Sequence, residues 1–372
     1  MRILIIGSDR KVFDEISAVA KRQIAYSGTS DNLDIIVFSL ASLQLRETKL
    51  SDRVTVYPSS SFSRFLYIFD AIRTARKLQK PDLISVQDPF ESGLAGYFVA
   101  KYFGVPLHIQ IHTDLMSPYF YRDTILNKIR FYISKFIIPR AKSIRVVSQR
   151  IKNSLLLAYP KIPEFSIQIL PIHVDRDKIK DSPIDVDLHK KYPQFKKIIL
   201  MASRLTREKN IGLAIDAMQA IVKKFPNAGL IIVGEGPMKK GLAVSVQGLG
   251  LEKNVILEDW SDSLSSYYKT TDLFLLTSNY DGYAMTVVES LVAGTPVIMT
   301  DVGCASEVVI DGQNGLVFSV GNLNKLIEAI SKFLSDPSLS SNLKSGAQKM
   351  IWQDSEDVYL KQYRKGWEVA LG

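Results

Sequence analysis

Two cations, Arg204 and Lys209, lie in a short segment whose surroundings suit an anion. The segment from 202 to 210 follows the apolar run Lys197–Ala202 and precedes an amphipathic stretch. Where a strand leads into a helix, free backbone N–H groups and the helix dipole favour negative charge, and Arg and Lys add charge-assisted hydrogen bonds. The pattern predicts a loop that binds a diphosphate, with a solvated charged loop as the alternative.

A glycine pair follows the next apolar run. Gly234 and Gly236 flank a glutamate, and Pro237 comes directly after them. Glycine lets the backbone approach a ligand closely, and proline suits the first turn of a helix. The motif predicts either a second ligand-binding loop or a plain tight turn. It lacks the G-x-G-x-x-G spacing, as does the turn at Gly7, so a nicotinamide-dependent dehydrogenase is disfavoured.

Two carboxylates, Asp281 and Glu289, are eight residues apart. Asp281 follows the apolar run Leu273–Thr277, and Glu289 lies about two turns into a predicted helix. Such a pair can meet two parts of one ligand, because carboxylates accept hydrogen bonds from sugar hydroxyls. Together with the two upstream segments, the pair predicts a site for a nucleotide-diphosphate sugar.

In this order the motifs resemble the donor half of family 4 glycosyltransferases. The resemblance covers most of Ile198 to Phe318, including Ala293-Gly294-Thr295-Pro296-Val297, and more loosely the first half of the chain. It implies a GT-B fold, in which two Rossmann-like doubly wound α/β domains face a central cleft. It also implies a retaining hexosyltransferase that uses a nucleotide-sugar donor in cell-envelope polysaccharide or glycolipid synthesis.

The resemblance implies roles for single residues. Arg204 and Lys209 bind the donor diphosphate, and the glycine pair lines the same donor site. Glu289 holds the ribose, and Trp260 lies where the family holds the base. Asp281 approaches the transferred sugar. The family usually has Glu at this position, and because Asp is one methylene shorter, the choice of donor sugar can differ.

A histidine in the first half, His112, ends the predicted strand Leu107–His112. A lone histidine is more often structural, but family 4 enzymes place one at this strand end, beside the donor sugar and facing the cleft. The resemblance therefore implies a catalytic role for His112. Asp114 can orient its ring, and Asp88 and Asp114 are predicted to line the acceptor side.

The implied chemistry is electrostatic. Stabilising the departing diphosphate and positioning the acceptor hydroxyl account for transfer better than a two-carboxylate glycosidase scheme. By the same resemblance, the leaving phosphate can take the acceptor proton. No cluster of metal-ligating residues stands out, so we expect transfer without a metal ion or other cofactor.

The elements that must position these residues alternate between short apolar runs and amphipathic stretches, which predicts parallel sheets with crossover helices. In such sheets ligands bind beyond the carboxyl ends of the strands. Predicted helices include Phe65–Leu78, Ile125–Ile138 and Ile211–Phe225. The predicted strands are Ile3–Gly7, Asp34–Ser39, Val54–Tyr57, Asp82–Gln87, Leu107–His112, Ser143–Ser148, Ser166–Leu170, Lys197–Ala202, Gly229–Val233, Asn254–Leu257, Leu273–Thr277, Pro296–Thr300 and Gly315–Phe318.

A chain of 372 residues usually needs more than one hydrophobic core. We predict an N-terminal domain over 1–175, a nucleotide-sugar domain over 176–353, and a C-terminal helix over 354–372 that can cross back to the first domain. The charged, proline-containing junction Pro171–Phe195 is predicted to be a linker. The single cysteine excludes an intramolecular disulfide or a cysteine-rich zinc site. With no signal peptide or membrane-spanning run, a cytoplasmic location is expected.

Positive charge is concentrated in the first half. Residues 1–175 hold 24 Lys+Arg against 15 Asp+Glu, whereas the remainder holds 23 of each. The segment 122–152 carries nine basic residues against Asp123 alone. Its interleaved apolar residues suit a helix packed on the sheet, and its cations suit an anionic leaflet. We therefore expect an anionic membrane surface as a partner and a glycan or lipid-linked acceptor.

Other functions remain open at this point. A GT-B-like nucleotide-sugar epimerase or a sugar phosphorylase would share the fold, although no pyridoxal phosphate lysine can be located. An assay separates these classes from a transferase, because a transferase moves the sugar to an added acceptor, whereas an epimerase interconverts the free donor. A non-enzymatic anion- or nucleic-acid-binding protein is the remaining class. It is disfavoured, because no nucleic-acid motif or aromatic-basic stacking platform is found.

Overall fold

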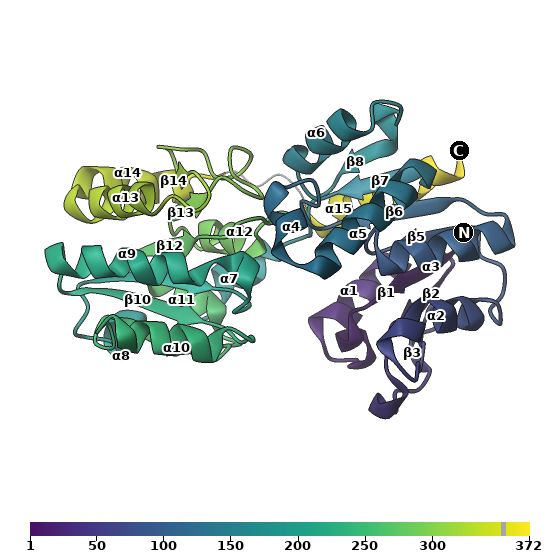
Figure 1. Cartoon of the computed structure of the whole chain (residues 1–372), viewed down its shortest axis with the longest axis horizontal. Coiled ribbons are helices and arrows are strands. Elements are labelled where there is room, and N and C mark those ends of the chain that lie inside the picture. The colour runs from purple at the N-terminus through teal and green to yellow at the C-terminus, as the bar shows by residue number, and fades with distance from the viewer. Residues whose placement is uncertain (351–354) are drawn as a thin grey trace. The chain divides into compact units, whose positions relative to one another are not determined.

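The computed structural model describes residues 1–350 and 355–372 and divides the chain into two compact units (Figure 1). Unit 1 comprises Met1–Pro171 and the C-terminal helix α15 (Glu356–Leu371), and unit 2 begins at Ile172. Each unit has its own largely parallel sheet with helices on both faces, so the predicted α/β class is confirmed. The predicted boundary between 353 and 354 lies outside the described residues.

The sheet of unit 1 has the strand order β3-β4-β2-β1-β5-β6-β7-β8. All neighbours are parallel except β3, which is antiparallel to β4 at the edge. The strands are β1 (Arg2–Gly7), β2 (Asn32–Val37), β3 (Thr48–Ser51), β4 (Val54–Pro58), β5 (Leu83–Val86), β6 (Leu107–Ile111), β7 (Ser143–Val146) and β8 (Ile167–Ile169).

The helices of unit 1 are divided between the two faces of the sheet by its connections. The β1–β2 crossover runs one way along the sheet and the later crossovers run the other way, so right-handed connections place α1 on one face and α2, α3 and α5 on the other. In agreement, α2 packs on α3 and α3 on α5, whereas α15 packs on α1 and β7. These helices are α1 (Ala18–Ser27), α2 (Tyr67–Ala75, preceded by η3, Arg64–Leu66), α3 (Glu91–Phe103), α4 (Pro118–Asp123), α5 (Ile125–Ile137) and α6 (Gln149–Ala158).

The last helix, α15, completes the core of unit 1. Its Trp367 is fully buried, and Tyr363 stacks on Tyr26 of α1. Between α15 and the sheet lies Arg145 of β7, also buried, which donates to the carbonyl of Leu170 (2.9 Å) and the hydroxyl of Tyr359 (2.8 Å). A buried cation is costly unless its donors are satisfied, so these contacts bind the end of the chain to unit 1.

Unit 2 has the strand order β11-β10-β9-β12-β13-β14, all parallel. In chain order this is the 3-2-1-4-5-6 arrangement of dinucleotide-binding folds. Its strands are β9 (Lys197–Ala202), β10 (Ala228–Val233), β11 (Val255–Glu258), β12 (Leu273–Leu276), β13 (Val297–Thr300) and β14 (Gly315–Phe318). Its helices are α7 (Arg176–Asp181), α8 (Leu188–Lys191), α9 (Ile211–Lys224), α10 (Lys239–Gly248), α11 (Leu264–Thr270), α12 (Met285–Val292), α13 (Leu323–Ser335) and α14 (Pro337–Gln348).

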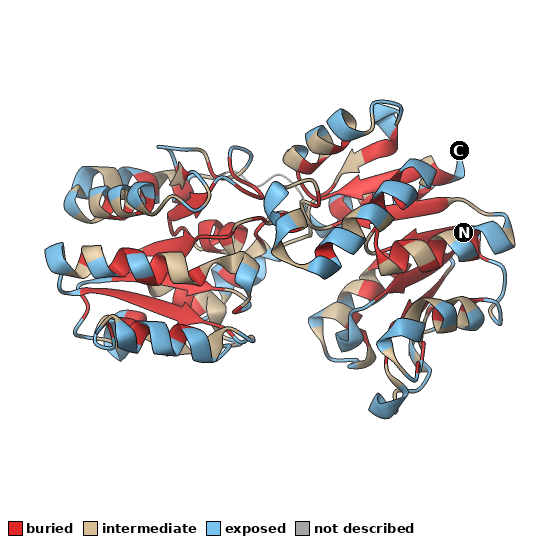
Figure 2. Cartoon of the chain, viewed as in Figure 1, coloured by how far each residue is buried: buried red, intermediate tan, exposed pale blue. Residues whose placement is uncertain are grey.

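Every predicted strand has a counterpart, and the central strands of both sheets are buried, whereas the edge strand β3 has no buried residue (Figure 2). Expectations about two other segments need correction. The junction Pro171–Phe195 is more than a linker, since it forms α7 and α8 and buries Leu188 and Phe195 in unit 2. The helix predicted over Ile125–Ile138 is present as α5, but its apolar residues pack inward only in part, because Ile125 and Ile129 are exposed. No helix among the described residues is long and apolar enough to cross a membrane.

Candidate functional site

The chain order of unit 2 reverses between β9 and β12, and ligands bind at such a switch point, beyond the carboxyl ends of the strands. Lys209 lies in the short helix η6 (Arg207–Lys209) after β9, and Asp281 lies in the loop after β12. Their side chains form an ion pair, with 2.5 Å between Nζ and Oδ2, and are only 16% and 14% exposed. The structure thus brings two of the predicted site residues together at the switch point.

Backbone contacts hold the two loops in register. The hydroxyl of Thr277 donates to the carbonyls of Lys209 and Asn210, at 3.0 Å each. The amide of Asn279 donates to the carbonyl of Glu208 at 2.7 Å. Asn210 adopts a left-handed conformation (φ 45°), which ends η6 and lets α9 begin directly. Sequence reasoning did not predict a site role for Thr277 or Asn279, although Thr277 ends the apolar run Leu273–Thr277 and Asn279 follows it.

Asp281 also shapes the start of α12. Its Oδ1 accepts a 3.1 Å hydrogen bond from the amide of Ala284, which has φ 64° and precedes the first helical residue. One carboxylate oxygen therefore holds the helix start and the other holds Lys209.

Glu289 lies on α12 with much of its side chain buried, and its Oε2 accepts a 2.8 Å hydrogen bond from the hydroxyl of Tyr268 on α11. Burial raises the pKa of Glu289, and the hydrogen bond from Tyr268 opposes that rise. Tyr268 is itself fully buried, which raises the pKa of its hydroxyl. Sequence reasoning missed Tyr268, because it is one of two adjacent tyrosines in a short polar helix.

Arg204 is the freely accessible cation of the group. Its side chain is 77% exposed, and its nearest acidic partner is Glu208, 3.6 Å away. Glu208 also accepts a 2.6 Å hydrogen bond from Thr206. The guanidinium therefore stays near the loop and is available to an anion from solvent. No shared contact joins Arg204 to the Lys209–Asp281 pair among the described residues.

The glycine pair serves loop packing. A Cβ on Gly234 would lie 1.9 Å from the carbonyl oxygen of Ser203, and one on Gly236 would lie 2.4 Å from that of Leu205. The loops after β9 and β10 are also joined by a 2.8 Å hydrogen bond from the amide of Leu205 to the carbonyl of Glu235. Pro237 precedes α10 rather than opening it. Ligand contact by these glycines stays a prediction.

Trp260 follows β11 and is half exposed. The strand end before it is held firmly, because Glu258 accepts hydrogen bonds from Lys191 (2.7 Å), Tyr267 (2.6 Å) and Tyr192. Burial would raise the pKa of Glu258, but these donors lower it. The indole is therefore presented from a fixed strand end, although the structure brings it into contact with none of the other predicted residues.

His112 follows β6 in unit 1 and is half-buried. Burial, reinforced by the charge of Arg145, lowers its pKa to about 3, so the ring is neutral at ordinary pH. Its Nδ1 is buried without a hydrogen-bond partner among the described residues. No hydrogen bond joins Asp114 to His112 among the described residues, so the predicted orienting bond is absent there. The carboxylate of Asp114 has its pKa raised by burial.

Asp88, predicted for the acceptor side, anchors the start of α3. It accepts hydrogen bonds from the amide of Phe90 (2.8 Å) and the hydroxyl of Ser92 (2.6 Å). Burial raises its pKa. Like His112, it follows a strand at the carboxyl edge of the unit 1 sheet.

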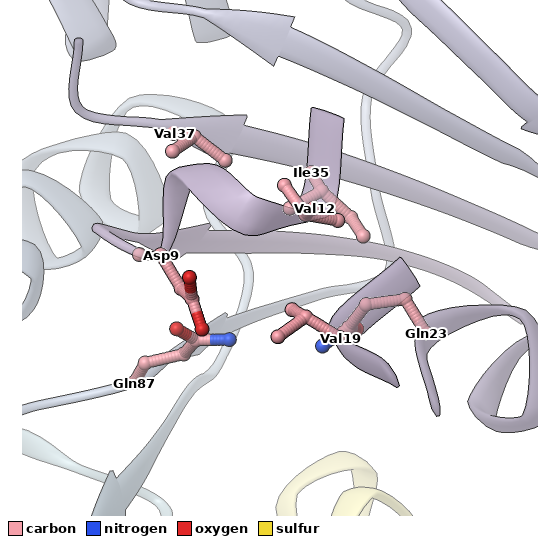
Figure 3. Close-up of a pocket in the computed structure, with 8 residues that line it drawn as sticks. Asp9, Val12, Val19, Gln23, Ile35, Val37 and Gln87 are labelled. Carbon is pink, nitrogen blue, oxygen red and sulfur yellow. The ribbon is translucent and has the colours of Figure 1, made fainter. Parts of the chain in front are cut away.

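Unit 1 also has a switch point, between β1 and β5, and a pocket lies there (Figure 3). Asp9 and Gln87 point toward one another in it, and the buried Gln23 has an Oε1 without a partner. The signal that would have found it is the polar turn directly after the first strand. Its lining residues are Gly7, Asp9, Val12, Val19, Gln23, Ile35, Val37 and Gln87. Among the described residues, no group of three or more His, Cys, Asp or Glu is placed to hold a metal ion.

Comparison with known families matches both units. Residues 29–178 match the model described as Glycosyltransferase Family 4, and residues 187–350 match Glycosyl transferases group 1. The chain is 24% identical over 335 residues to the alpha-monoglucosyldiacylglycerol synthase of Acholeplasma laidlawii, covering 82% of this chain and 80% of that one. It is 31% identical over 193 residues to the poly(glycerol-phosphate) alpha-glucosyltransferase of Bacillus subtilis, covering 51% of this chain but only 28% of that relative.

Solved structures agree on the fold. The sucrose-phosphate synthase of Thermosynechococcus elongatus superposes with a TM-score of 0.81 at 18% identity, covering 99% of both chains. Anabaena HepE, in complex with UDP and glucose, superposes with a TM-score of 0.77 at 20% identity, also covering 99% of both. At these identities the likeness shows the fold alone. Since the two family matches cover most of the chain, this protein is a GT-B glycosyltransferase, with a Family 4 first half and a group 1 second half.

Proposed function

We propose that this glycosyltransferase moves a sugar from a nucleotide-diphosphate donor to a glycan or lipid-linked acceptor, with retention of the anomeric configuration. The observation that carries the proposal is the Lys209–Asp281 ion pair at the switch point of unit 2. A cation and a sugar-binding carboxylate meet there, at the edge of the sheet where this fold class receives nucleotides.

In the structure the ion pair satisfies the charges of both side chains. A bound diphosphate offers Lys209 a stronger anionic partner than one carboxylate, and Arg204 is exposed and ready to add a second cation. Asp281, relieved of Lys209, can then accept a hydrogen bond from a sugar hydroxyl. Glu289 is proposed to hold the ribose. Phosphate binding and sugar recognition are in this way coupled through one contact.

The same cations supply the catalytic charge. Groups already in place stabilise the negative charge that develops on the leaving diphosphate. Such electrostatic stabilisation makes the largest single contribution to the rate enhancement of many enzymes. We propose that the neutral ring of His112 hydrogen-bonds the transferred sugar and that no resident metal ion or cofactor is needed. Unchanged transfer after exhaustive chelation by EDTA is the expected result.

The acceptor class is drawn from the relatives. One is named as a synthase of alpha-monoglucosyldiacylglycerol, and the other as an alpha-glucosyltransferase of poly(glycerol-phosphate). UDP is the ligand in the HepE complexes. These support a UDP-sugar donor and a glycolipid or envelope-polymer acceptor. We further propose that the protein works at the cytoplasmic face of a membrane and does not bind nucleic acid.

A thermal-shift series tests the donor site. UDP, GDP and ADP are compared on the wild type, on Arg204→Ala with Lys209→Ala, and on the control Lys223→Ala, which removes an exposed cation at the far end of α9. One nucleotide should raise the melting temperature of the wild type and the control only. A shift retained in the double variant would contradict the site. Transfer to an added acceptor, instead of interconversion of the free donor sugar, then separates a transferase from an epimerase.

A further inference from the structure

Helix α5 exposes many of its apolar residues. Its buried residues are Asn127, Ser134 and Ile137, whereas Ile125 is 78% exposed and Tyr132 60%. A soluble helix on a sheet normally buries its apolar stripe. Contiguous exposed apolar surface marks an interaction site on a folded protein, so this face of α5 is a candidate for one.

The exposed apolar surface continues beyond α5. Phe65 in η3 is 96% exposed and Phe69 on α2 is 64% exposed. Helix α3 packs against both α2 and α5 on the same face of the sheet, and it adds Phe98 and Tyr102. We call this surface the docking face. Its apolar members are Phe62, Phe65, Phe69, Phe98, Tyr102, Ile125, Leu126, Ile129, Tyr132 and Phe136.

Cations are set among these apolar side chains. Arg76 lies over the ring of Tyr102 at 4.8 Å, and Arg140 lies over that of Phe136 at 3.7 Å. Acidic groups are few, and Glu91 is neutralised by Arg130 at 3.0 Å. The exposed cations of the docking face are Arg64, Arg73, Arg76, Lys77, Lys101, Lys128, Lys135 and Arg140. The face therefore combines aromatic and aliphatic side chains with a clear excess of positive charge.

We propose that the docking face binds an anionic bilayer, with its apolar side chains in the headgroup region and its cations on the lipid phosphates. Interfacial helices carry this combination of bulky apolar residues and Lys or Arg. A protein partner fits less well, because the core of a protein interface is depleted of lysine. This proposal rests on the proposed function and extends it, because it places the acceptor of the transferred sugar in a membrane.

The position of the docking face suits that role. Segment η3 follows β4, and α5 follows β6 by way of α4, so both begin at the carboxyl edge of the unit 1 sheet. His112 and Asp88 lie at that same edge. A lipid-linked acceptor whose tail stays in the bilayer would therefore present its head group to the edge where the acceptor side is predicted.

Vesicle flotation of the full chain tests the proposal. Vesicles of phosphatidylcholine alone are compared with vesicles that also contain phosphatidylglycerol. The variants are Lys128→Gln with Lys135→Gln, and Ile125→Ser with Ile129→Ser. Their matched controls in unit 2 are Lys223→Gln with Lys332→Gln and the exposed Val244→Ser. All these positions are exposed, so folding should be unaffected.

We expect binding only with phosphatidylglycerol, weakened by salt and reduced roughly fivefold for each lysine removed. The isoleucine pair should weaken binding as well, and the controls should not. Equal binding by the lysine pair and its control overturns the proposal, as does a concentration-dependent dimer that the isoleucine pair abolishes. The thermal shift caused by a nucleotide is measured in every variant as a check that the donor site is intact. Loss of that shift without loss of vesicle binding would count against the proposed function and not against the docking face.

Discussion

The hydroxyl of Tyr268 on α11 donates a hydrogen bond to the carboxylate of Glu289 on α12. Tyr268 is fully buried and cannot reach a ligand, so it acts on one only through Glu289. The bond turns one oxygen of the carboxylate inward and sets the direction of the other. Tyr268 is thus a positioning residue for the group proposed to hold the ribose.

Replacing Tyr268 with Phe should weaken UDP binding by about 1.5 kcal/mol, roughly tenfold, because a hydrogen bond to a charged group is lost. Calorimetric titration with UDP and with its 2′,3′-dideoxy analogue measures the effect. The loss should be confined to UDP, whose hydroxyls Glu289 would meet. The neighbouring Tyr267→Phe, which affects Glu258 instead, is the control. Equal losses with both nucleotides would show that Tyr268 is merely structural.

Removing one partner of the Lys209–Asp281 pair should be worse for stability than removing both. Each side chain is mostly buried, so Lys209→Ala leaves a carboxylate without its cation, at a cost of about 3 kcal/mol. The double variant with Asp281→Ala should recover part of that loss. Urea unfolding of both single variants and the double variant gives the coupling energy. Additive losses would mean that the pair contributes nothing in solution.

Two glycines of unit 2 should respond oppositely to alanine. A Cβ at Gly234 meets the carbonyl of Ser203, so Gly234→Ala should cost about 2 kcal/mol by overpacking and should weaken UDP binding. Gly241 lies within α10 with open space around it, so Gly241→Ala should stabilise by about 0.5–1 kcal/mol. Melting temperatures measure both. An unchanged melting temperature for Gly234→Ala would show that close loop packing does not require glycine at this position.

Acid should destabilise unit 1 through His108. Burial, with the nearby charge of Arg145, lowers the pKa of this histidine from 6.5 to about 3. Between those values the unfolded chain binds a proton that the folded chain does not, so stability is complete above pH 6.5 and is lost as the pH falls toward 3. His108→Asn should reduce the slope of unfolding free energy by about 1.4 kcal/mol per pH unit. Equal pH slopes of the unfolding free energy for the wild type and the variant, measured by urea unfolding, would contradict this.

The strands were predictable because buried parallel strands are continuous apolar runs bounded by polar turns. β3 was not, since its Thr48–Ser51 is a short polar edge strand. Helices α7 and α8 were missed for a related reason. Each buries a single apolar side chain, Ile179 in one and Leu188 in the other, which is too little to give a period.

The site was predictable as a set of loops but not as a set of contacts. Motif order placed Lys209 and Asp281 after two strands, yet they are 72 residues apart, and only the strand order makes those strands neighbours. Tyr268 carries no sequence signal, because its role arises from the packing of α11 on α12. The ligand roles of all these residues remain predictions.

The contact between Arg145 and the C-terminal helix has a consequence for how the protein is made. Synthesis proceeds from the N-terminus, so β7 leaves the ribosome long before Tyr359, Tyr363 and Trp367 exist. Until then the guanidinium of Arg145 lacks its partner on α15 and the sheet face beneath lacks its cover. The described part of unit 2 is complete before α15 is made. The first unit to be translated is therefore the last to finish folding, and a chain broken off before its final helix leaves that unit open to proteases and chaperones.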